Sequence, residues 1–471
     1  MKQQIQGRAK PRPGFAQRRK LIAGLTLAGL ALNGYAGLKL LGELWEQHIN
    51  PTALKTMPVD KHRLLSIPGD PSASPYRWLR DGSHLLIVDT QTPNYNIINV
   101  ISGERVKTLT SAFPYGRRQL YWSSDHRYMV EFGDTQAQSY LNERRAIAWD
   151  LQSGKQIWKS PPLGYADSSD LSPEGSYFAQ YQDESSSGKQ QSKNVQVWDI
   201  RQNQLLTSWP VQALRPGPEP EMRFYVRTMA WSPDGTRLSL ICSDGAIQVW
   251  HVARDQLLWT YTAAATAYTT NAILQQWSPD GKTLLLWQIM AGKSKMHMLN
   301  AQTGKLIQQF MVASDIRGLG GTFNLPDQHD QFLAWSNDGA RLALRIYNEL
   351  SGEKSVQIYD AHTGQKLFTC QGVTGMLTSF AWSPDGRFLA AGNIVDGLSS
   401  DKGGLTSTIQ FWDASTGTAL FTYQAPRAPI QLSWSPDSRF LATYNAQDYN
   451  VRVGIHYSLF AGFALQVFRV S

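Results

Sequence analysis

The sequence predicts an all-β protein built from repeated four-stranded antiparallel sheets, and three observations lead to this prediction. Between Trp231 and Tyr261, short runs of alternating apolar and polar residues are rich in β-branched and aromatic side chains. These runs are separated by turn sequences such as Ser232-Pro233-Asp234-Gly235, in which proline presets φ and glycine accepts a positive φ. The same unit then recurs along the chain. One such sheet cannot bury both of its faces, so neighbouring copies must cover it.

The turn motif marks the start of each copy. Eight starts follow one another at intervals of 44 to 60 residues, at Trp78, Trp122, Leu171, Trp231, Trp277, Trp335, Trp382 and Trp434. Closing a set of sheets into a ring removes their long exposed edges. We therefore expect eight copies arranged as a closed ring, and the alternative is seven copies plus an atypical terminal unit.

The third strand of each copy carries its own signature. It reads AIAWDL at 146–151, VQVWDI at 195–200, IQVWHV at 247–252, VQIYDA at 356–361 and IQFWDA at 409–414. With the repeat period, these strands resemble the WD-repeat family of β-propellers over roughly residues 60 to 471. The resemblance implies a closed β-propeller, and the Ser-Pro-Asp-Gly turn is shared with bacterial propellers. No Gly-His dipeptide occurs, so the family's buried His-centred hydrogen-bond set is expected to be absent.

The charge of the chain is concentrated at its amino end. The formal net charge is +8, and eight basic residues precede Glu43, the first acidic residue. The other 45 − 8 = 37 basic residues equal the 37 acidic ones in number. The rest of the chain, residues 40–471, is therefore formally neutral, and no nucleic-acid partner is expected. The two cysteines, Cys242 and Cys370, are predicted to be buried apolar side chains without a bridge or a metal.

The amino-terminal segment has the features of a membrane anchor. Residues 1–20 form a basic tail, and residues 21–38 carry no charge. As a helix these 18 residues would span about 27 Å, close to the roughly 30 Å hydrocarbon core. We expect a hydrophobic helix within 21–42 that anchors the protein, a linker over 43–60, and the propeller on the extracytoplasmic side. The alternative is an export signal, since Arg18-Arg19-Lys20-Leu21-Ile22 resembles a twin-arginine sequence.

The way in which the ring closes is left open by the sequence. Residues 62–67 form a lone predicted strand ahead of the first copy, and such a strand commonly completes the last sheet in propellers of this family. The last copy could instead supply its own second, third and fourth strands from 439–444, 451–456 and 464–470. In that case the amino-terminal strand would be redundant or would add at an edge.

The connections predict on which face a partner binds. If the strands of one sheet are called a, b, c and d, the short a–b and c–d turns lie on one face and the b–c and d–a connections on the other. The long connections, 181–193, 210–226, 312–331 and 393–407, all fall in the second group. Repeat proteins usually place binding loops together on one face. The candidate partner-binding residues there are Tyr115, Arg117, Arg118, Arg215, Glu219, Arg223, Tyr225, Asp315, Arg317, Phe323, His329 and Asp396.

Signatures of catalysis are sparse. The chain has no HExxH, GxSxG or Walker sequence, and none of its nine histidines are paired at metal-ligand spacing. Residues 148–158 resemble the tryptophan-docking motif of eight-bladed quinone dehydrogenases, but the motif occurs once. We therefore expect a non-catalytic scaffold without a cofactor or metal, which presents its loop-rich face to a protein or peptide. The alternative is an extracytoplasmic propeller enzyme or small-molecule sensor, quinoprotein-like, that uses the central channel.

Overall fold

The protein is described by a computed structural model. It describes residues 55–58, 63–69, 76–88, 92–113, 118–134, 144–163, 168–183, 193–212, 224–262, 273–290, 293–312, 333–347, 354–372, 376–395, 406–425, 428–446 and 463–470. The chain divides into two compact units, residues 1–55 and 56–471. The hydrophobic helix expected within 21–42 lies outside the described residues. Among the residues that are described, no helix is long and apolar enough to cross a bilayer.

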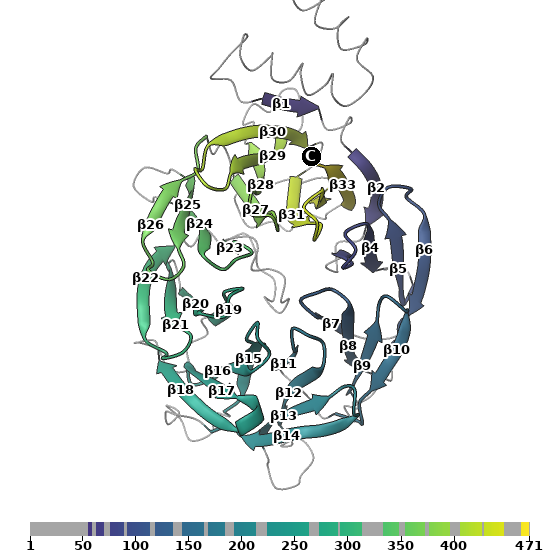
Figure 1. Cartoon of the computed structure of the whole chain (residues 1–471), viewed down its shortest axis with the longest axis vertical. Coiled ribbons are helices and arrows are strands. Elements are labelled where there is room, and N and C mark those ends of the chain that lie inside the picture. Colours follow the sequence, from purple (N-terminus) through teal and green to yellow (C-terminus); the bar gives the residue numbers. More distant parts are fainter. Residues whose placement is uncertain are drawn as a thin grey trace, which may run out of the picture. The chain divides into compact units, whose positions relative to one another are not determined.

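Residues 56–471 form an eight-bladed β-propeller, as the sequence predicts (Figure 1). Blade 1 contains β3 (Tyr76–Trp78), β4 (His84–Val88), β5 (Asn94–Asn99) and β6 (Arg105–Thr110). Blade 2 contains β7 (Arg118–Trp122), β8 (Tyr128–Asp134), β9 (Arg144–Asp150) and β10 (Lys155–Lys159). Blade 3 contains β11 (Ser168–Leu171), β12 (Tyr177–Asp183), β13 (Lys193–Asp199) and β14 (Gln204–Pro210). Blade 4 contains β15 (Val226–Trp231), β16 (Arg237–Cys242), β17 (Ala246–His251) and β18 (Gln256–Thr262), with the 3-10 turn η3 (Val252–Arg254) before β18.

The second half of the ring repeats this plan. Blade 5 contains β19 (Ile273–Trp277), β20 (Thr283–Met290), β21 (Lys293–Asn300) and β22 (Leu306–Val312). Blade 6 contains β23 (Leu333–Trp335), β24 (Arg341–Tyr347), β25 (Lys354–Asp360) and β26 (Lys366–Thr369). Blade 7 contains β27 (Met376–Trp382), β28 (Phe388–Val395), β29 (Thr406–Asp413) and β30 (Ala419–Ala425), and β1 (Lys55–Pro58) adds a fifth strand beside β30. Blade 8 contains β31 (Ala428–Trp434), β32 (Phe440–Ala446), β33 (Phe463–Arg469) and β2 (Arg63–Gly69).

Blade 8 closes the ring with strands from both ends of the propeller. The strand β33 pairs antiparallel with β32 on one side and with β2 on the other, with Gln466 opposite Thr443 and Ser66. The lone amino-terminal strand is therefore the outer strand of the last blade. The alternative in which 464–470 is the fourth strand is wrong, because β33 is the third. Residues 451–456, the third strand of that alternative, lie outside the described residues.

Neighbouring blades are joined by the tryptophans that end the a strands. The indole Nε1 of Trp382 donates to the carbonyl of Ala334 in blade 6 at 3.0 Å, and Trp434 donates to Ala381 in blade 7 at 3.1 Å. Trp78 donates to Ser433 at 3.0 Å, which continues this pattern from blade 8 to blade 1. Each of these three tryptophans thus buries apolar area between two sheets and satisfies its one polar atom there. The hydrophobic core consists of such clusters between adjacent blades.

The two cysteines are buried and free, as expected from their strand positions. Burial raises the pKa of the Cys370 thiol to about 12. Cys242 is fully enclosed, and its pKa is raised by burial and by Asp244. A thiol that stays protonated in a closed apolar site is a poor nucleophile, so both side chains act as small core residues.

Candidate interaction faces

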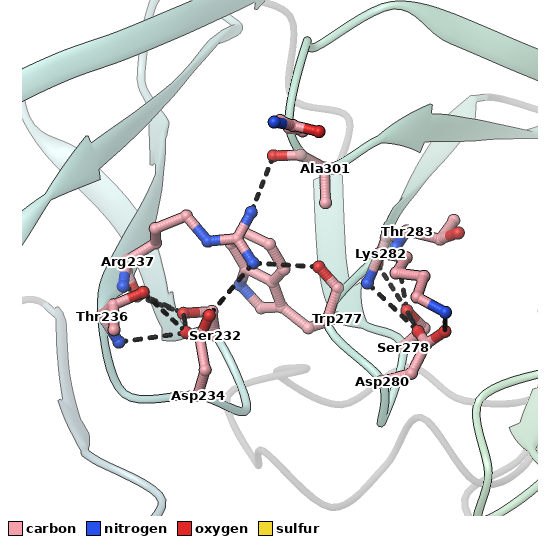
Figure 2. Close-up of polar contacts among 12 residues, drawn as sticks. Ser232, Asp234, Thr236, Arg237, Trp277, Ser278, Asp280, Lys282, Thr283 and Ala301 are labelled. Carbon is pink, nitrogen blue, oxygen red and sulfur yellow. Dashed lines mark hydrogen bonds and ion pairs between the residues drawn. The ribbon is translucent and has the colours of Figure 1, made fainter.

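The a–b and c–d turns form one face of the propeller, called the turn face here, and hydrogen bonds order each a–b turn. In blade 4 the hydroxyl of Ser232 donates to Asp234 at 2.5 Å and accepts from the backbone N–H of Arg237 at 2.9 Å. Asp234 also accepts from the N–H of Thr236 at 3.1 Å (Figure 2). Although burial raises the pKa of Asp234, these hydrogen bonds and Arg237 outweigh it and hold the pKa below its ordinary value.

Adjacent a–b turns pack directly on one another. The glycine of each motif has positive φ, for example +70° at Gly339. A Cβ added at Gly339 would lie 2.7 Å from the backbone nitrogen of Asp280 in blade 5. A Cβ at Gly235 would lie 2.6 Å from the carboxylate of Glu174 in blade 3. At Gly339 the glycine is therefore favoured both by the backbone conformation and by the backbone of the neighbouring blade, whereas the near atom at Gly235 is the end of a side chain that can move.

Polar side chains cross between blades at a pocket of about 470 Å³ on the turn face. Arg237 of blade 4 donates to the carbonyls of Gly281 and Ala301 in blade 5, both at 3.0 Å, and lies over the ring of Trp277 (Figure 2). His362 of blade 6 contacts Asp280 of blade 5 at 2.9 Å. The lining residues are Arg237, Asp280, Gly281, Lys282, Thr283, Asn300, Gln302, Ile307 and His362. Its charged groups are therefore engaged in linking three blades.

The chemistry of this pocket is structural. Lys282 pairs with Asp280 at 3.5 Å, and Thr283 donates to the carbonyl of Ala361 at 2.9 Å. Burial raises the pKa of Asp280, but hydrogen bonds from Ser278, Lys282 and His362 lower it below its ordinary value, so the carboxylate stays charged. Among the described residues, no group of three or more His, Cys, Asp or Glu side chains could hold a metal ion.

The opposite side of the ring, called the loop face here, is defined by the strand ends at which the b–c and d–a connections begin and end. All eight sheets are antiparallel with the expected strand order, so the b–c and d–a connections leave from the same side of the ring. The strands extend further into these connections than predicted. What remains between the described strands is 184–192, 213–223, 313–332 and 396–405. The strand ends therefore confirm that the b–c and d–a connections leave from one side of the ring.

Most of the twelve candidate residues lie outside the described residues. These are Tyr115, Arg117, Arg215, Glu219, Arg223, Asp315, Arg317, Phe323, His329 and Asp396. Of the remaining two, Arg118 begins β7 opposite Gly133 in blade 2, and Tyr225 immediately precedes β15 in blade 4. The two described residues thus lie at strand ends of the loop face in different blades.

Tyr225 is held at the loop face by its neighbours. Its backbone N–H donates to the Ser243 hydroxyl at 3.1 Å, and the N–H of Ser243 donates back to the Tyr225 carbonyl at 2.9 Å. The guanidinium of Arg227 lies 5.8 Å from the centre of the Tyr225 ring. Tyr225 and Phe224 are half-buried and pack on the core between blades 3 and 4. An ordered aromatic residue with a cation beside it is typical of a contact that anchors a partner.

The sequence pattern did not indicate two groups near this face. Arg227 occupies an a strand, where an alternating pattern gives no reason to single it out. Glu131 of β8 is fully buried, and accepts from the Tyr95 hydroxyl at 2.6 Å and from the Ser111 hydroxyl. The sequence feature that could have indicated its burial is its position between Val130 and Phe132 in an apolar run. It links blades 1 and 2, and the hydroxyl donors satisfy the carboxylate.

Comparison with known proteins supports the repeat assignment. Two stretches of the chain match the WD40 repeat. Residues 220–251 and 353–413 match the family described as WD domain, G-beta repeat. The chain is 26% identical over 267 residues to WD repeat-containing protein slp1 of Schizosaccharomyces pombe, a match that covers 55% of this chain and 45% of slp1. It is 22% identical over 291 residues to a component of eukaryotic translation initiation factor 3 of Neosartorya fischeri, over 55% and 37% of the two chains.

These curated relatives are longer than the region that matches, since the chain spans less than half of their length. Two solved structures share the fold. The C-terminal WD40 domain of Sif2 has a TM-score of 0.53 at 12% identity, over 89% of this chain and all of that one. The computationally designed Ika8 protein has a TM-score of 0.52 at 14% identity, over 87% and 100%. The protein is thus an eight-bladed propeller, of which residues 220–251 and 353–413 match the WD40 repeat.

Proposed function

We propose that this protein is a non-catalytic binding scaffold that presents its loop face to a partner protein, with the propeller held at a membrane by residues 21–38. The observation that carries the proposal is the difference between the two faces. Turn-face residues are used to join blades, as Arg237 and His362 show. The long connections at 184–192, 213–223, 313–332 and 396–405 instead all leave from strand ends of the loop face, so substitutions in them should leave the contacts between turns intact.

The described part of the loop face supports recognition of a protein. Tyr225 and Arg227 form a stacked aromatic and cationic pair on rigid strand ends. Such residues dominate the binding energy of many protein interfaces, because they bury a large area at little conformational cost. The relatives include a component of a translation initiation factor, which by its name is part of a larger assembly. A role as a scaffold in an assembly is the simplest function common to such propellers.

A site-specific photocross-linking experiment tests this proposal. The photoreactive residue p-benzoylphenylalanine replaces Tyr225 in the full-length chain, and in a control it replaces Asn337, an exposed turn-face residue. We expect irradiated cells to give a discrete cross-linked species from position 225 and none from position 337. Cross-linking of the same protein from position 337, or from neither 225 nor Arg118, would contradict the proposed face. Separate fractionation of cells tests the membrane tether.

A further inference from the structure

The outer strands of the blades share an unusual feature. In each of the seven c–d pairs of blades 1 to 7, one residue of the outer strand is left unpaired as a β-bulge. That residue is always aliphatic: Val106, Ile157, Leu206, Leu258, Ile307, Leu367 and Leu420. All except Ile307 are exposed, from 37% at Leu420 to 54% at Val106. The rim of the propeller therefore displays aliphatic side chains to solvent at one position in blade after blade.

The charge of these outer strands is uneven around the ring. The strands β6, β10, β14, β18, β22, β26 and β30 contain no acidic residue. They contain five basic residues, and four of these belong to blades 1 and 2: Arg105, Lys107, Lys155 and Lys159. The outer strands β14, β18 and β22 of blades 3 to 5 have the same aliphatic bulge but no charge. Blades 1 and 2 therefore combine exposed aliphatic residues with positive charge.

The outer edges of blades 1 and 2 meet at one contact, and their exposed basic and aliphatic residues are together called the basic rim patch here. The Nζ of Lys107 in blade 1 donates to the carbonyl of Ser153 in blade 2 at 2.9 Å, which joins the two outer edges. The neighbouring turn adds Ile101, which is 56% exposed. Glu104 is the one acidic residue within 101–110 and 151–160. The patch comprises Ile101, Arg105, Val106, Lys107, Lys155, Ile157 and Lys159.

We propose that the basic rim patch docks on an anionic membrane surface. Ile101, Val106 and Ile157 would enter the boundary between headgroups and acyl chains, while Arg105, Lys155 and Lys159 pair with lipid phosphates. Exposed apolar residues bordered by Lys and Arg are the combination that binds anionic interfaces. The proposal deepens the proposed function and rests on its membrane tether, because the patch would fix how the propeller sits against the bilayer.

The first two strands of the propeller lie on blades 7 and 8. The strand β2 is the outer strand of blade 8, and blade 8 adjoins blade 1 through the stacked rings of Phe440 and Trp78, 6.2 Å apart. The chain therefore meets the ring first through β1 at the edge of blade 7 and reaches the blade next to blade 1 through β2 (Figure 1). Residues 39–54 separate the uncharged segment from β1, and this many residues can reach at most roughly 50 Å when extended. A tethered propeller could therefore bring the edge of blade 1 to the membrane.

A lipid surface explains the patch better than an acidic peptide does. A peptide that adds to a sheet edge needs a straight row of unpaired backbone groups. The bulges at Val106 and Ile157 interrupt that row on both strands of the patch, so an added peptide could pair only over a short stretch, as the four-residue strand β1 does with the bulged strand β30. The exposed side chains remain free to enter a fluid interface, which needs no matching backbone.

The test uses the full-length chain labelled at a single cysteine with an environment-sensitive dye. Cys242 and Cys370 are buried, so a dye reacts with an introduced cysteine. Val106→Cys reports on the patch, and Leu367→Cys is the matched control, because it is the bulge residue of β26 with similar exposure of 47%. We expect a blue shift at position 106 with phosphatidylglycerol-containing vesicles, little shift with phosphatidylcholine alone, and no shift at position 367. High salt should reverse the shift.

A charge variant sharpens the result. In the triple variant Arg105→Gln, Lys155→Gln and Lys159→Gln, the lipid concentration that gives half of the maximal shift should rise about 100-fold. Each basic residue near an anionic surface contributes roughly a factor of five to the affinity. Three results would overturn the proposal. The shifts at positions 106 and 367 could be equal, the shift at position 106 could be independent of anionic lipid, or soluble polyglutamate could give the same shift. Co-sedimentation with phosphatidylcholine vesicles reports on the tether alone. Its failure would therefore reject the anchor without affecting the signal from the patch.

Discussion

The turn face and the loop face of the propeller show how one repeated unit can meet two requirements. On the turn face, short motifs pack against the next blade, as Gly339 does against Asp280. On the loop face, connections of very different length leave the same strand ends. The turn motif recurs because each copy is constrained by its neighbours as well as by its own turn. The loop connections vary because loop closure costs little extra free energy as a loop grows.

The largest effect is expected where the turn face is tightest. Gly339→Ala places a methyl group 2.7 Å from the Asp280 nitrogen at a residue with φ of +70°. Backbone strain and overpacking should together lower the free energy of unfolding by roughly 2–5 kcal/mol. Denaturant unfolding of the full chain measures this change.

The repeat supplies a matched control for that variant. Gly386 occupies the same motif position with φ of +71°, but an added Cβ there has nothing within 4 Å. Gly386→Ala should therefore show the backbone cost alone, roughly 1–2 kcal/mol. If the two variants lose equal stability, the packing of neighbouring turns contributes nothing, and the contrast between the faces is weakened.

The indole hydrogen bonds give the next effect. Trp382→Phe leaves the Ala334 carbonyl without its donor at 3.0 Å, whereas the buried Nε1 of Trp335 has no hydrogen-bond partner among the residues that the structure describes. Both rings are nearly buried, at 7% and 8% exposure, so the loss of packing should be similar. Trp382→Phe should cost about 1 kcal/mol more than Trp335→Phe in thermal or denaturant unfolding. Equal costs would show that this bond does not stabilise the joint between blades 6 and 7.

The raised pKa of Asp170 predicts a pH dependence of stability. Its direction is opposite to that expected from the aspartates of the a–b turns whose pKa values are lowered. Burial raises the pKa of Asp170 to about 7, against the lowering effect of the N–H groups of Trp231 and Leu171. The folded state then holds more protons than the unfolded state between roughly pH 4 and 7, so stability falls as the pH rises through this window. Asp170→Asn should flatten that fall in unfolding experiments from pH 4 to 8. An unchanged slope would show that Asp170 is not its source.

The regular part of the fold could be predicted from the sequence because short turns fix the strand register. In blade 4 the predicted third strand, 247–252, agrees with β17 to within a residue at each end. The strand order of blade 8 could not be predicted from the sequence, because β33 follows β32 after a long connection and lacks the third-strand signature. The alternation of strands located the loop face, but contacts such as Arg227 over Tyr225 depend on the twist of each blade and on neighbouring side chains, which the sequence pattern does not report.

The smallest effect is expected at His362, where the turn face joins blades 5 and 6 through a half-exposed pair. His362→Gln removes the 2.9 Å contact with Asp280 and should lower stability by less than about 1 kcal/mol, since solvent screens exposed pairs. Asp280 keeps its hydrogen bonds from Ser278 and Lys282, so its pKa should remain below the ordinary value. The stability supplied by this lowered pKa is present above the unfolded pKa near 4 and is lost as the pH falls through the folded value. Unfolding at pH 3 and pH 7 in His362→Gln and the unaltered chain measures both quantities. A loss of several kcal/mol would mean that the blades depend on single ion pairs more than on packed turns.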